Sequence, residues 1–254
     1  MKKSELEQIF SSFNNKKVLI VGDAMIDAYM WGNIERMSPE APVPVVDINK
    51  LESRLGGAAN CALNVKSLGA NPILCTVVGN DNNGVKFEEL MKESSLSTEG
   101  MLVCSDRKTT VKTRVISEGK QQLRLDEEYK HPIIIEKQFL NNFKELLNNT
   151  DVIILQDYNK GVLTKKIISE VILIAKNKGI PTIVDPKNDN FLEYKGVDIF
   201  KPNLKEIKDG MKIEFDDKND SELEKATSDL RNKLSAKGIL LTLSERGICI
   251  NSEE

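Results

Sequence analysis

The sequence predicts an α/β fold in which a doubly wound, mostly parallel sheet is covered by helices on both faces. Three observations carry this prediction. Short apolar runs recur along the chain, these runs are continuous rather than alternating, and stretches with helical spacing of apolar residues lie between them. Continuous apolar runs suit strands that are buried on both faces, and the alternation of strands with helices is typical of an open α/β domain.

The predicted strands each end at a polar residue or a glycine, and they span residues 17–23, 73–79, 151–157, 180–185, 197–203 and 238–244. Two helices between them have recognisable ends. Residues 164–178 run up to Gly179, and residues 221–237 open with a capping box formed by Ser221 and Glu224. Strands and helices therefore alternate over most of the chain.

Two segments do not fit a buried parallel sheet. Residues 43–48 and 109–126 read as strands with one polar face, and the second segment turns as a hairpin near Gly119. We expect them to form a small sheet that projects from the edge of the domain as a lid or an oligomer contact. An edge meander without function is the alternative.

Composition and charge narrow the function classes. The chain has 254 residues, 36 Lys and Arg against 39 Asp and Glu, and a net charge of −3, so nothing in it favours nucleic acid or an anionic membrane as a partner. The lone His131 excludes a multi-His metal site and argues against a His-based triad, and we expect it in a surface loop. The four cysteines have no metal-ligand spacing, and no apolar stretch could cross a membrane. We expect a reduced, cytoplasmic protein.

Polar residues follow or close several of the predicted strands, namely Asp23, Asp27, Asp157, Asp185 and Asn203. In open α/β sheets, ligands bind beyond the carboxyl ends of the strands. A helix cap or a turn could explain each residue alone. Several carboxylates at one sheet edge repel one another unless they bind hydroxyls, a cation or a base, so together they predict a ligand site.

Small residues precede a predicted helix over residues 61–68. The stretch 56–60, Gly-Gly-Ala-Ala-Asn, would let a ligand approach the free N–H groups of the helix start, although a plain Gly-Gly turn is equally open. No G-x-G-x-x-G follows a strand, and residues 79–86 miss the P-loop pattern because Val85 stands where Lys is required. A P-loop NTPase and a dinucleotide dehydrogenase are both disfavoured.

A further group of residues has features of an ATP-binding edge. Lys187 places a cation just past a strand, and Asn203 and Glu206, three residues apart, share one face of a helix start. Such a pair could orient a phosphate and hold hydrated Mg²⁺, which takes few protein ligands. An acid that satisfies the helix N-terminus is the structural alternative.

Together these motifs resemble the ribokinase and phosphofructokinase-B sugar kinases, and within them the bacterial D-glycero-β-D-manno-heptose-7-phosphate kinases. The resemblance covers nearly the whole chain. It rests on Gly22-Asp23-x-Met25-x-Asp27, Ser38-Pro39-Glu40-Ala41-Pro42-Val43-Pro44-Val45, Leu55-Gly56-Gly57-Ala58-Ala59-Asn60, Ser67-Leu68-Gly69-Ala70, Gln121-Gln122-x-Arg124-x-Asp126, Asp157-Tyr158-x-Lys160-Gly161, Asp185-Pro186-Lys187, Pro202-Asn203-x-x-Glu206 and Thr242-x-Ser244-Glu245-x-Gly247.

The resemblance implies a ribokinase-like fold and an ATP- and Mg²⁺-dependent transfer of the γ-phosphoryl group to the anomeric hydroxyl of the heptose 7-phosphate, for ADP-heptose and lipopolysaccharide synthesis. It implies that sugar hydroxyls bind Asp23, Asp27, Gly56, Gly57, Asn60 and Asp157. It places ATP on Lys187, Asn203, Glu206, Thr242, Ser244 and Gly247, with Mg²⁺ near Glu206 through water. Our own assignment for the 7-phosphate is Lys112, Arg114, Gln122 and Arg124 in the lid. We also expect a homodimer through the lid strands.

The sequence departs from the family pattern at its C-terminal end. The Gly-Ala-Gly-Asp stretch that supplies the family's anion hole and catalytic base does not occur in residues 1–254. We expect this base to lie beyond Glu254, and we assign no catalytic residue within the chain. The expected result is an incomplete kinase domain, without the C-terminal part of the fold, that is weakly active or inactive alone. The alternatives are a kinase of another sugar or nucleoside, and a non-catalytic sugar-binding or dimerising remnant.

Overall fold

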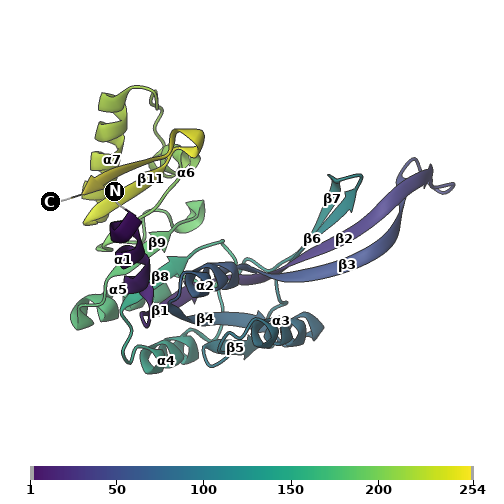
Figure 1. Ribbon diagram of the computed structural model, residues 1–254, viewed down its shortest axis with the longest axis horizontal. Coiled ribbons are helices and arrows are strands. Elements are labelled where there is room, and N and C mark those ends of the chain that lie inside the picture. Colours follow the sequence, from purple (N-terminus) through teal and green to yellow (C-terminus); the bar gives the residue numbers. More distant parts are fainter. Residues whose placement is uncertain (1–2, 253–254) are drawn as a thin grey trace.

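An eight-stranded sheet lies at the centre of the molecule, in the order β12-β11-β10-β9-β8-β1-β4-β5. The computed structural model describes residues 3–252 (Figure 1). Every neighbouring pair is parallel except β11 and β12. The strands are β1 (Lys17–Gly22), β4 (Asn71–Gly79), β5 (Met101–Cys104), β8 (Val152–Gln156), β9 (Thr182–Asp185), β10 (Ile199–Phe200), β11 (Gly238–Thr242) and β12 (Ile248–Ser252). The predicted doubly wound, mostly parallel sheet is confirmed.

The strand order places a topological switch point between β1 and β8. After β1 the chain adds β4 and β5 on one side, and it then returns to place β8 against the other side of β1. A crevice for ligands forms at such a point, outside the carboxyl ends of the strands. Strand β10 is confined to Ile199–Phe200 instead of the predicted seven positions 197–203, and Pro202, which has no N–H to donate, lies just past its end.

Helices cover both faces of the sheet, and β1 shows how. Its residues Val18 and Ile20 pack into one apolar cluster with α2 (Ala58–Ser67) and α3 (Asn82–Glu93). Leu19 and Val21 point to the other face, which is covered by α4 (Glu136–Leu146), α5 (Lys165–Lys178), α6 (Leu204–Met211) and α7 (Asp220–Leu234). The N-terminal helix α1 (Lys3–Phe13) has no buried residue. None of the described helices has the length and apolarity needed to span a bilayer.

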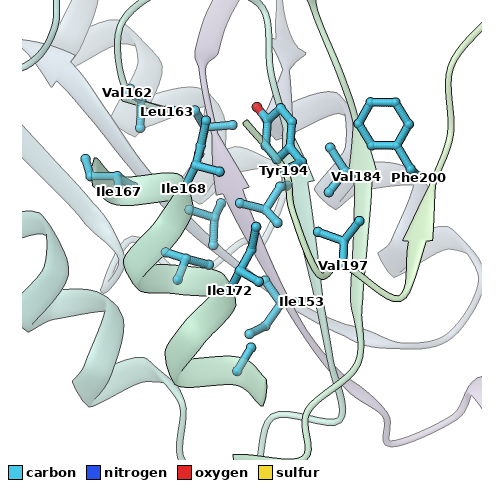
Figure 2. Close-up of a cluster of buried hydrophobic side chains, with 14 of the residues drawn as sticks. Ile153, Val162, Leu163, Ile167, Ile168, Ile172, Val184, Tyr194, Val197 and Phe200 are labelled. Atoms are coloured by element: carbon cyan, nitrogen blue, oxygen red, sulfur yellow. The ribbon is translucent and has the colours of Figure 1, made fainter. Parts of the chain in front are cut away.

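The larger cluster lies under α5, as Figure 2 shows. There Ile168 and Ile172 face the strand residues Ile153 and Val184, and all four are at most 5% exposed. Burial of each such side chain stabilises the fold by roughly 1.5–3 kcal/mol. The apolar runs read from the sequence are therefore the inner strands of a two-sided core.

Helix ends agree with the sequence prediction at α5 and differ at α7. Thr164 caps α5, and Gly179 ends it in the left-handed conformation, with φ 66°. The capping box predicted for Ser221 and Glu224 is wrong. Asn219 is the N-cap of α7, because its side chain accepts from the Ser221 amide at 3.1 Å and so places Ser221 inside the first turn. The helix also stops at Leu234, ahead of its predicted end at residue 237.

A four-stranded sheet, the lid, projects from the main domain (Figure 1). Its strands, in the order β3-β2-β6-β7, are β2 (Ala24–Met37), β3 (Pro44–Gly57), β6 (Val111–Ser117) and β7 (Lys120–Glu127). The hairpin turn predicted near Gly119 is confirmed, with positive φ at Glu118 and Gly119. Strand β2 was not predicted, and the predicted strand 43–48 continues to Gly57. Helix α2 consequently starts at Ala58 rather than at Cys61.

Sites that the sequence excluded have ordinary structural roles. Asp81 caps α3 by accepting from the Gly84 amide at 2.7 Å, so a capped helix replaces the near-miss P-loop. His131 is exposed in the loop before α4, as predicted. All four cysteines are free thiols. Among residues 3–252, no group of three or more His, Cys, Asp and Glu side chains is placed to hold a metal ion.

Candidate active site

Asp23 follows β1 at the switch point, and its carboxylate holds the loop after β8. Oδ2 accepts from the amides of Tyr158 at 2.9 Å and Lys160 at 3.0 Å, and Oδ1 accepts from the Val162 amide at 3.0 Å. The residue is 1% exposed, and burial raises its pKa although the three amides and Arg107 oppose the rise. Asp23 therefore positions the loop, and its carboxylate does not reach open solvent.

Arg107 is a buried cation beside Asp23 that sequence reasoning missed. It is 6% exposed, its Nη2 donates to the Lys160 carbonyl, and burial lowers its pKa. Its Nη1 has no hydrogen-bond partner among the described residues. Because a buried charge needs a counter-charge, Arg107 and Asp23 together fix the start of the loop.

Asp157 directly follows β8, across the switch point from Asp23. Its carboxylate accepts from the Tyr194 hydroxyl at 2.6 Å, the Asn190 amide group at 3.1 Å and the Asn159 backbone amide at 2.8 Å. Burial and the nearby Asp23 raise its pKa to about 6. A sugar hydroxyl at Asp157 would have to share a carboxylate that three protein donors already satisfy.

The Gly-Gly stretch packs closely against Asp27 and Asp23, and we call Asp27, Gly56, Gly57 and Asn60 together the floor. A Cβ on Gly56 would lie 2.4 Å from Asp27 Oδ2, and a Cβ on Gly57 would lie 2.4 Å from the Asp23 carbonyl oxygen. Gly57 also has φ +58°, which favours glycine. Asn60 follows as an exposed residue in the first turn of α2. The structure thus brings Asp27, Gly56, Gly57 and Asn60 together.

The predicted lid cations are already held by carboxylates. Arg114 Nη1 donates to Asp27 at 2.6 Å, Lys112 pairs with Asp126 at 3.0 Å, and Arg124 Nε pairs with Asp126 at 3.0 Å. These residues come from β2, β6 and β7. The lid therefore gathers three of the four side chains assigned to the phosphate on one face, with Lys112 and Arg124 sharing Asp126.

Gln122 does not join these cations. It lies at the register shift between β6 and β7, and its side chain donates to the Ser117 carbonyl at 3.4 Å. An extra residue in one strand disrupts the alternation of side chains on the two faces. Gln122 was assigned to the 7-phosphate together with Arg124, but the bulge separates its side chain from the lid cations.

Glu128, which sequence reasoning missed, links the lid to the main domain. It pairs with Lys160 at 2.7 Å, Lys112 at 3.3 Å and Lys130 at 3.3 Å. Hydrogen bonding and the charges of Lys160 and Lys112 overcome partial burial and lower its pKa to about 2. Since Lys160 belongs to the loop held by Asp23, this ion pair connects that loop to the base of the lid.

The predicted nucleotide residues gather beyond the ends of β9, β10 and β11. Asn203 and Glu206 form a capping box on α6, in which each side chain accepts from the other's backbone amide, at 2.9 and 3.0 Å. Lys187 donates to Glu206 Oε1. Thr242 forms a parallel bridge with Asn203. The helix-cap alternative for Asn203 and Glu206 is therefore realised, next to a lysine that could receive a phosphate.

The remaining residues assigned to ATP follow β11. Ser244 and Gly247 lie at the two ends of the turn that leads to β12, and both have positive φ, 54° and 89°. Ser244 and Gly247 are exposed. The turn therefore presents backbone and hydroxyl groups to solvent directly after the strand that carries Thr242.

The catalytic base was expected beyond Glu254, past the end of the chain. Glu254 itself lies outside the residues that the structure describes, which end with β12 at Ser252. The structure therefore does not test this expectation, and the position of the base beyond Glu254 stays a prediction. The site described above is one of binding and positioning residues.

The donor set at Glu206 fits Mg²⁺ only through water. Glu206 Oε2 accepts the Asn203 amide and Oε1 accepts Lys187, so both oxygens have protein partners, and the side chain is 8% exposed. Hydrated Mg²⁺ usually keeps several waters and binds mainly through substrate phosphates. These residues suit a nucleotide that brings its own cation.

Comparisons with known proteins agree with this geometry. The family model described as "pfkB family carbohydrate kinase" matches residues 15–254. The chain is 39% identical over 249 residues to the bifunctional protein HldE of Sulfurimonas denitrificans, covering 97% of this chain and 52% of that protein. It is 40% identical over 244 residues to HldE of Campylobacter jejuni, covering 96% and 51%. The chain thus spans about half the length of these curated relatives.

Solved structures show the same fold. Phosphofructokinase-2 from Escherichia coli, in a tetrameric inhibited form, superposes with a TM-score of 0.73 at 16% identity, covering 94% of this chain and 77% of that one. Ribokinase from Arabidopsis thaliana, solved with ribose and ATP, gives a TM-score of 0.69 at 16% identity, covering 94% and 75%. With the family model matching nearly its whole length, this chain belongs to the pfkB family of carbohydrate kinases.

Proposed function

We propose that this chain is the kinase part of an ADP-heptose synthesis protein and that it serves to phosphorylate the anomeric hydroxyl of D-glycero-β-D-manno-heptose 7-phosphate with ATP. One observation carries the proposal. The floor of Asp27, Gly56, Gly57 and Asn60 packs against Asp23, which follows β1 of the central sheet, and Lys187 and the Asn203–Glu206 cap follow β9 and β10 of the same central sheet. The likeness to proteins named HldE supports the choice of sugar.

At the sugar end, Asp27 is the best placed carboxylate for a hydroxyl. Its side chain is 24% exposed, and its carboxylate packs directly against Gly56, whose missing Cβ allows this close approach. Asn60 adds an amide at the start of α2. Asp157 stays a predicted sugar contact, whereas Asp23 acts by holding the loop that carries Tyr158 and Lys160.

At the nucleotide end, Lys187 would donate to a phosphate, and Glu206 would orient Lys187 and hold water on Mg²⁺. Thr242, Ser244 and Gly247 would line the same phosphates. ATP with Mg²⁺ supplies the phosphoryl group when bound, and such transfer depends chiefly on positioning and charge stabilisation. No residue of the 254 matches the family's Gly-Ala-Gly-Asp base, so binding provides the direct test.

Calorimetric titration of the chain with Mg-ATP and with heptose 7-phosphate tests the proposal. We expect Lys187→Ala to weaken Mg-ATP binding about tenfold or more, and Asp27→Asn to weaken heptose 7-phosphate binding to a similar degree, because each loses a charge-assisted hydrogen bond. The exposed Lys205→Ala and Asp47→Asn are matched controls. If fructose 6-phosphate or adenosine bound more tightly than heptose 7-phosphate, that compound would replace heptose 7-phosphate as the proposed substrate. Sugar binding without any ATP binding would favour the non-catalytic sugar-binding remnant.

The lid has a second face that favours a homodimer. Leu51, Leu123 and Leu125 are 69%, 54% and 48% exposed, and they lie on the face opposite the lid cations. Apolar patches of this kind mark association surfaces. We propose that two lids pair through this face. Sedimentation should show a dimer at micromolar concentration that Leu123→Glu converts to monomer, and a monomeric wild type would refute the pairing.

A further inference from the structure

The face of the lid that carries Asp27 has a regular array of charges. Residues paired across a sheet point to the same side, so the strand registers place side chains in rows. One row contains Arg54, Asp27, Lys112 and Asp126, and the next contains Glu52, Tyr29, Arg114 and Arg124. Arg54 belongs to this face although no motif of the sequence marked it.

Each arginine of this face is held in place by one guanidinium nitrogen that pairs with a carboxylate. Glu52 accepts from Arg54 Nε at 2.5 Å, Asp27 accepts from Arg114 Nη1 at 2.6 Å, and Asp126 pairs with Arg124 Nε at 3.0 Å. Within residues 3–252, the two Nη atoms of Arg54 and of Arg124 and the Nη2 of Arg114 have no hydrogen-bond or ion-pair partner. The carboxylates thus hold the guanidinium groups in place and leave donors that suit a phosphate.

These arginines lie close enough together that a bound anion would be favourable. Arg114 lies directly opposite Arg124 on the neighbouring strand, and like charges in that arrangement destabilise a sheet. Arg54 and Arg114 come from strands on the two sides of β2, and their guanidinium carbons lie 5.1 and 5.5 Å from the ring centroid of Tyr29. A phosphate group of charge −2 beside the Tyr29 ring would reach the free Nη donors of Arg54 and Arg114. Its charge would also offset the repulsion between Arg114 and Arg124.

The charged face is turned toward the substrate floor. Asp27, which bonds Arg114, covers Gly56, and Lys112 on the same face reaches Glu128, which pairs with Lys160 of the loop after β8. The exposed leucines of the lid point the other way. A sugar on the Gly56–Asn60 floor would therefore direct a distal substituent toward the arginines.

We propose that Arg54 grips the phosphate carried by the sugar acceptor, together with Arg114 and Arg124, and so selects a phosphorylated sugar over the free one. The inference rests on the proposed function and deepens it. Arg54 supplies a bidentate fork from β3, the strand that also ends in Gly56 and Gly57. Strand β3 would then contact the sugar ring through Gly56 and Gly57 and its phosphate through Arg54.

The test compares heptose 7-phosphate with unphosphorylated heptose by calorimetric titration. Arg54→Gln should weaken heptose 7-phosphate binding about 10- to 100-fold and change heptose binding less than about twofold, because the lost donors contact the phosphate alone. Arg54→Lys keeps the charge without the fork and should lose part of this preference. Arg36→Gln, on the exposed outer part of β2, is the matched control and should bind both sugars as the wild type does.

The outcomes separate the inference from the proposed function. If the wild type does not prefer heptose 7-phosphate to heptose, the proposed substrate is wrong. If the wild type shows the preference and Arg54→Gln and Arg54→Lys both retain it, Arg54 does not read the phosphate. An equal loss for both sugars would show that Arg54 supports the fold of the lid instead, and unfolding midpoints of the same variants would check this.

Discussion

Asp157 should make the stability of this protein fall as the pH rises from about 4 to 6. Its carboxyl group is 2% exposed, and it lies near Asp23, whose charge adds to the effect of burial in raising the Asp157 pKa to about 6. Tyr194, Asn190 and Asn159 donate to the carboxyl group and offset part of this rise. Replacing Asp157 by Asn removes the titration and keeps the size of the side chain.

The structure fixes the sign and the size of the effect. The pKa of Asp157 is higher in the folded state than the ordinary 3.8, so folding favours the protonated form. Its contribution to the free energy of unfolding is complete below about pH 4 and is lost as the pH rises through about 6. The difference between 3.8 and about 6 corresponds to about 3 kcal/mol at 1.36 kcal/mol per pKa unit.

Urea unfolding followed by circular dichroism between pH 3.5 and 7.5 measures this directly. The unfolding free energy of the wild type minus that of Asp157→Asn should fall by about 2–3 kcal/mol from pH 3.5 to pH 7.5. The exposed Asp189→Asn should run parallel to the wild type. Parallel curves for Asp157→Asn as well, or a difference that grows with pH, would refute the assignment of a protonated, buried Asp157.

Two further changes probe the frame of the site. Gly57→Ala should lower the free energy of unfolding by about 2–3 kcal/mol, because φ is +58° and the new Cβ meets the Asp23 carbonyl oxygen at 2.4 Å. Gly196→Ala is the control: φ is also positive there but the space is open, so the same urea titration should show a smaller loss of unfolding free energy. Glu128→Gln should cost about 1 kcal/mol at pH 7, allowing for solvent screening. Because the Glu128 pKa is lowered to about 2, its contribution is present above about pH 4.5 and is lost toward pH 2, so an undiminished cost at pH 2 would contradict the ion pair with Lys160 and Lys112.

The central sheet could be predicted because its signal is local. Each inner strand is an apolar run whose both faces are buried, and β1 shows this with five consecutive buried residues after Lys17. Strand β2 could not be predicted in the same way. Its register shifts at Trp31/Gly32 and Ile34/Arg36 interrupt the alternation of faces in its outer half, so a period of two does not run along its whole length.

The role of Asp23 could not be predicted from the sequence. Its position after a strand marked it only as a candidate site residue. The groups that occupy it are backbone amides of residues 158–162, which lie more than 130 positions later in the chain. A backbone donor has no sequence signature, so a structural carboxylate and a ligand-binding carboxylate look alike until the fold is known. Arg107 and Glu128 were missed because Lys160, which both contact, lies more than 30 positions later in the chain.

The carboxylates at the sheet edge show where a ligand can bind. Each escapes mutual repulsion in its own way: Asp23 through amides and Arg107, Asp157 through a raised pKa, Asp27 through Arg114 and Asp185 through Lys201 at 3.1 Å. The first two are almost fully buried, whereas Asp27 and Asp185 are 24% and 29% exposed. A polar ligand can replace the partner of a solvent-exposed ion pair far more easily than it can replace buried backbone amides. The exchangeable partners therefore lie at Asp27 and Asp185, on either side of the switch point, and the sugar and the phosphates should meet between them.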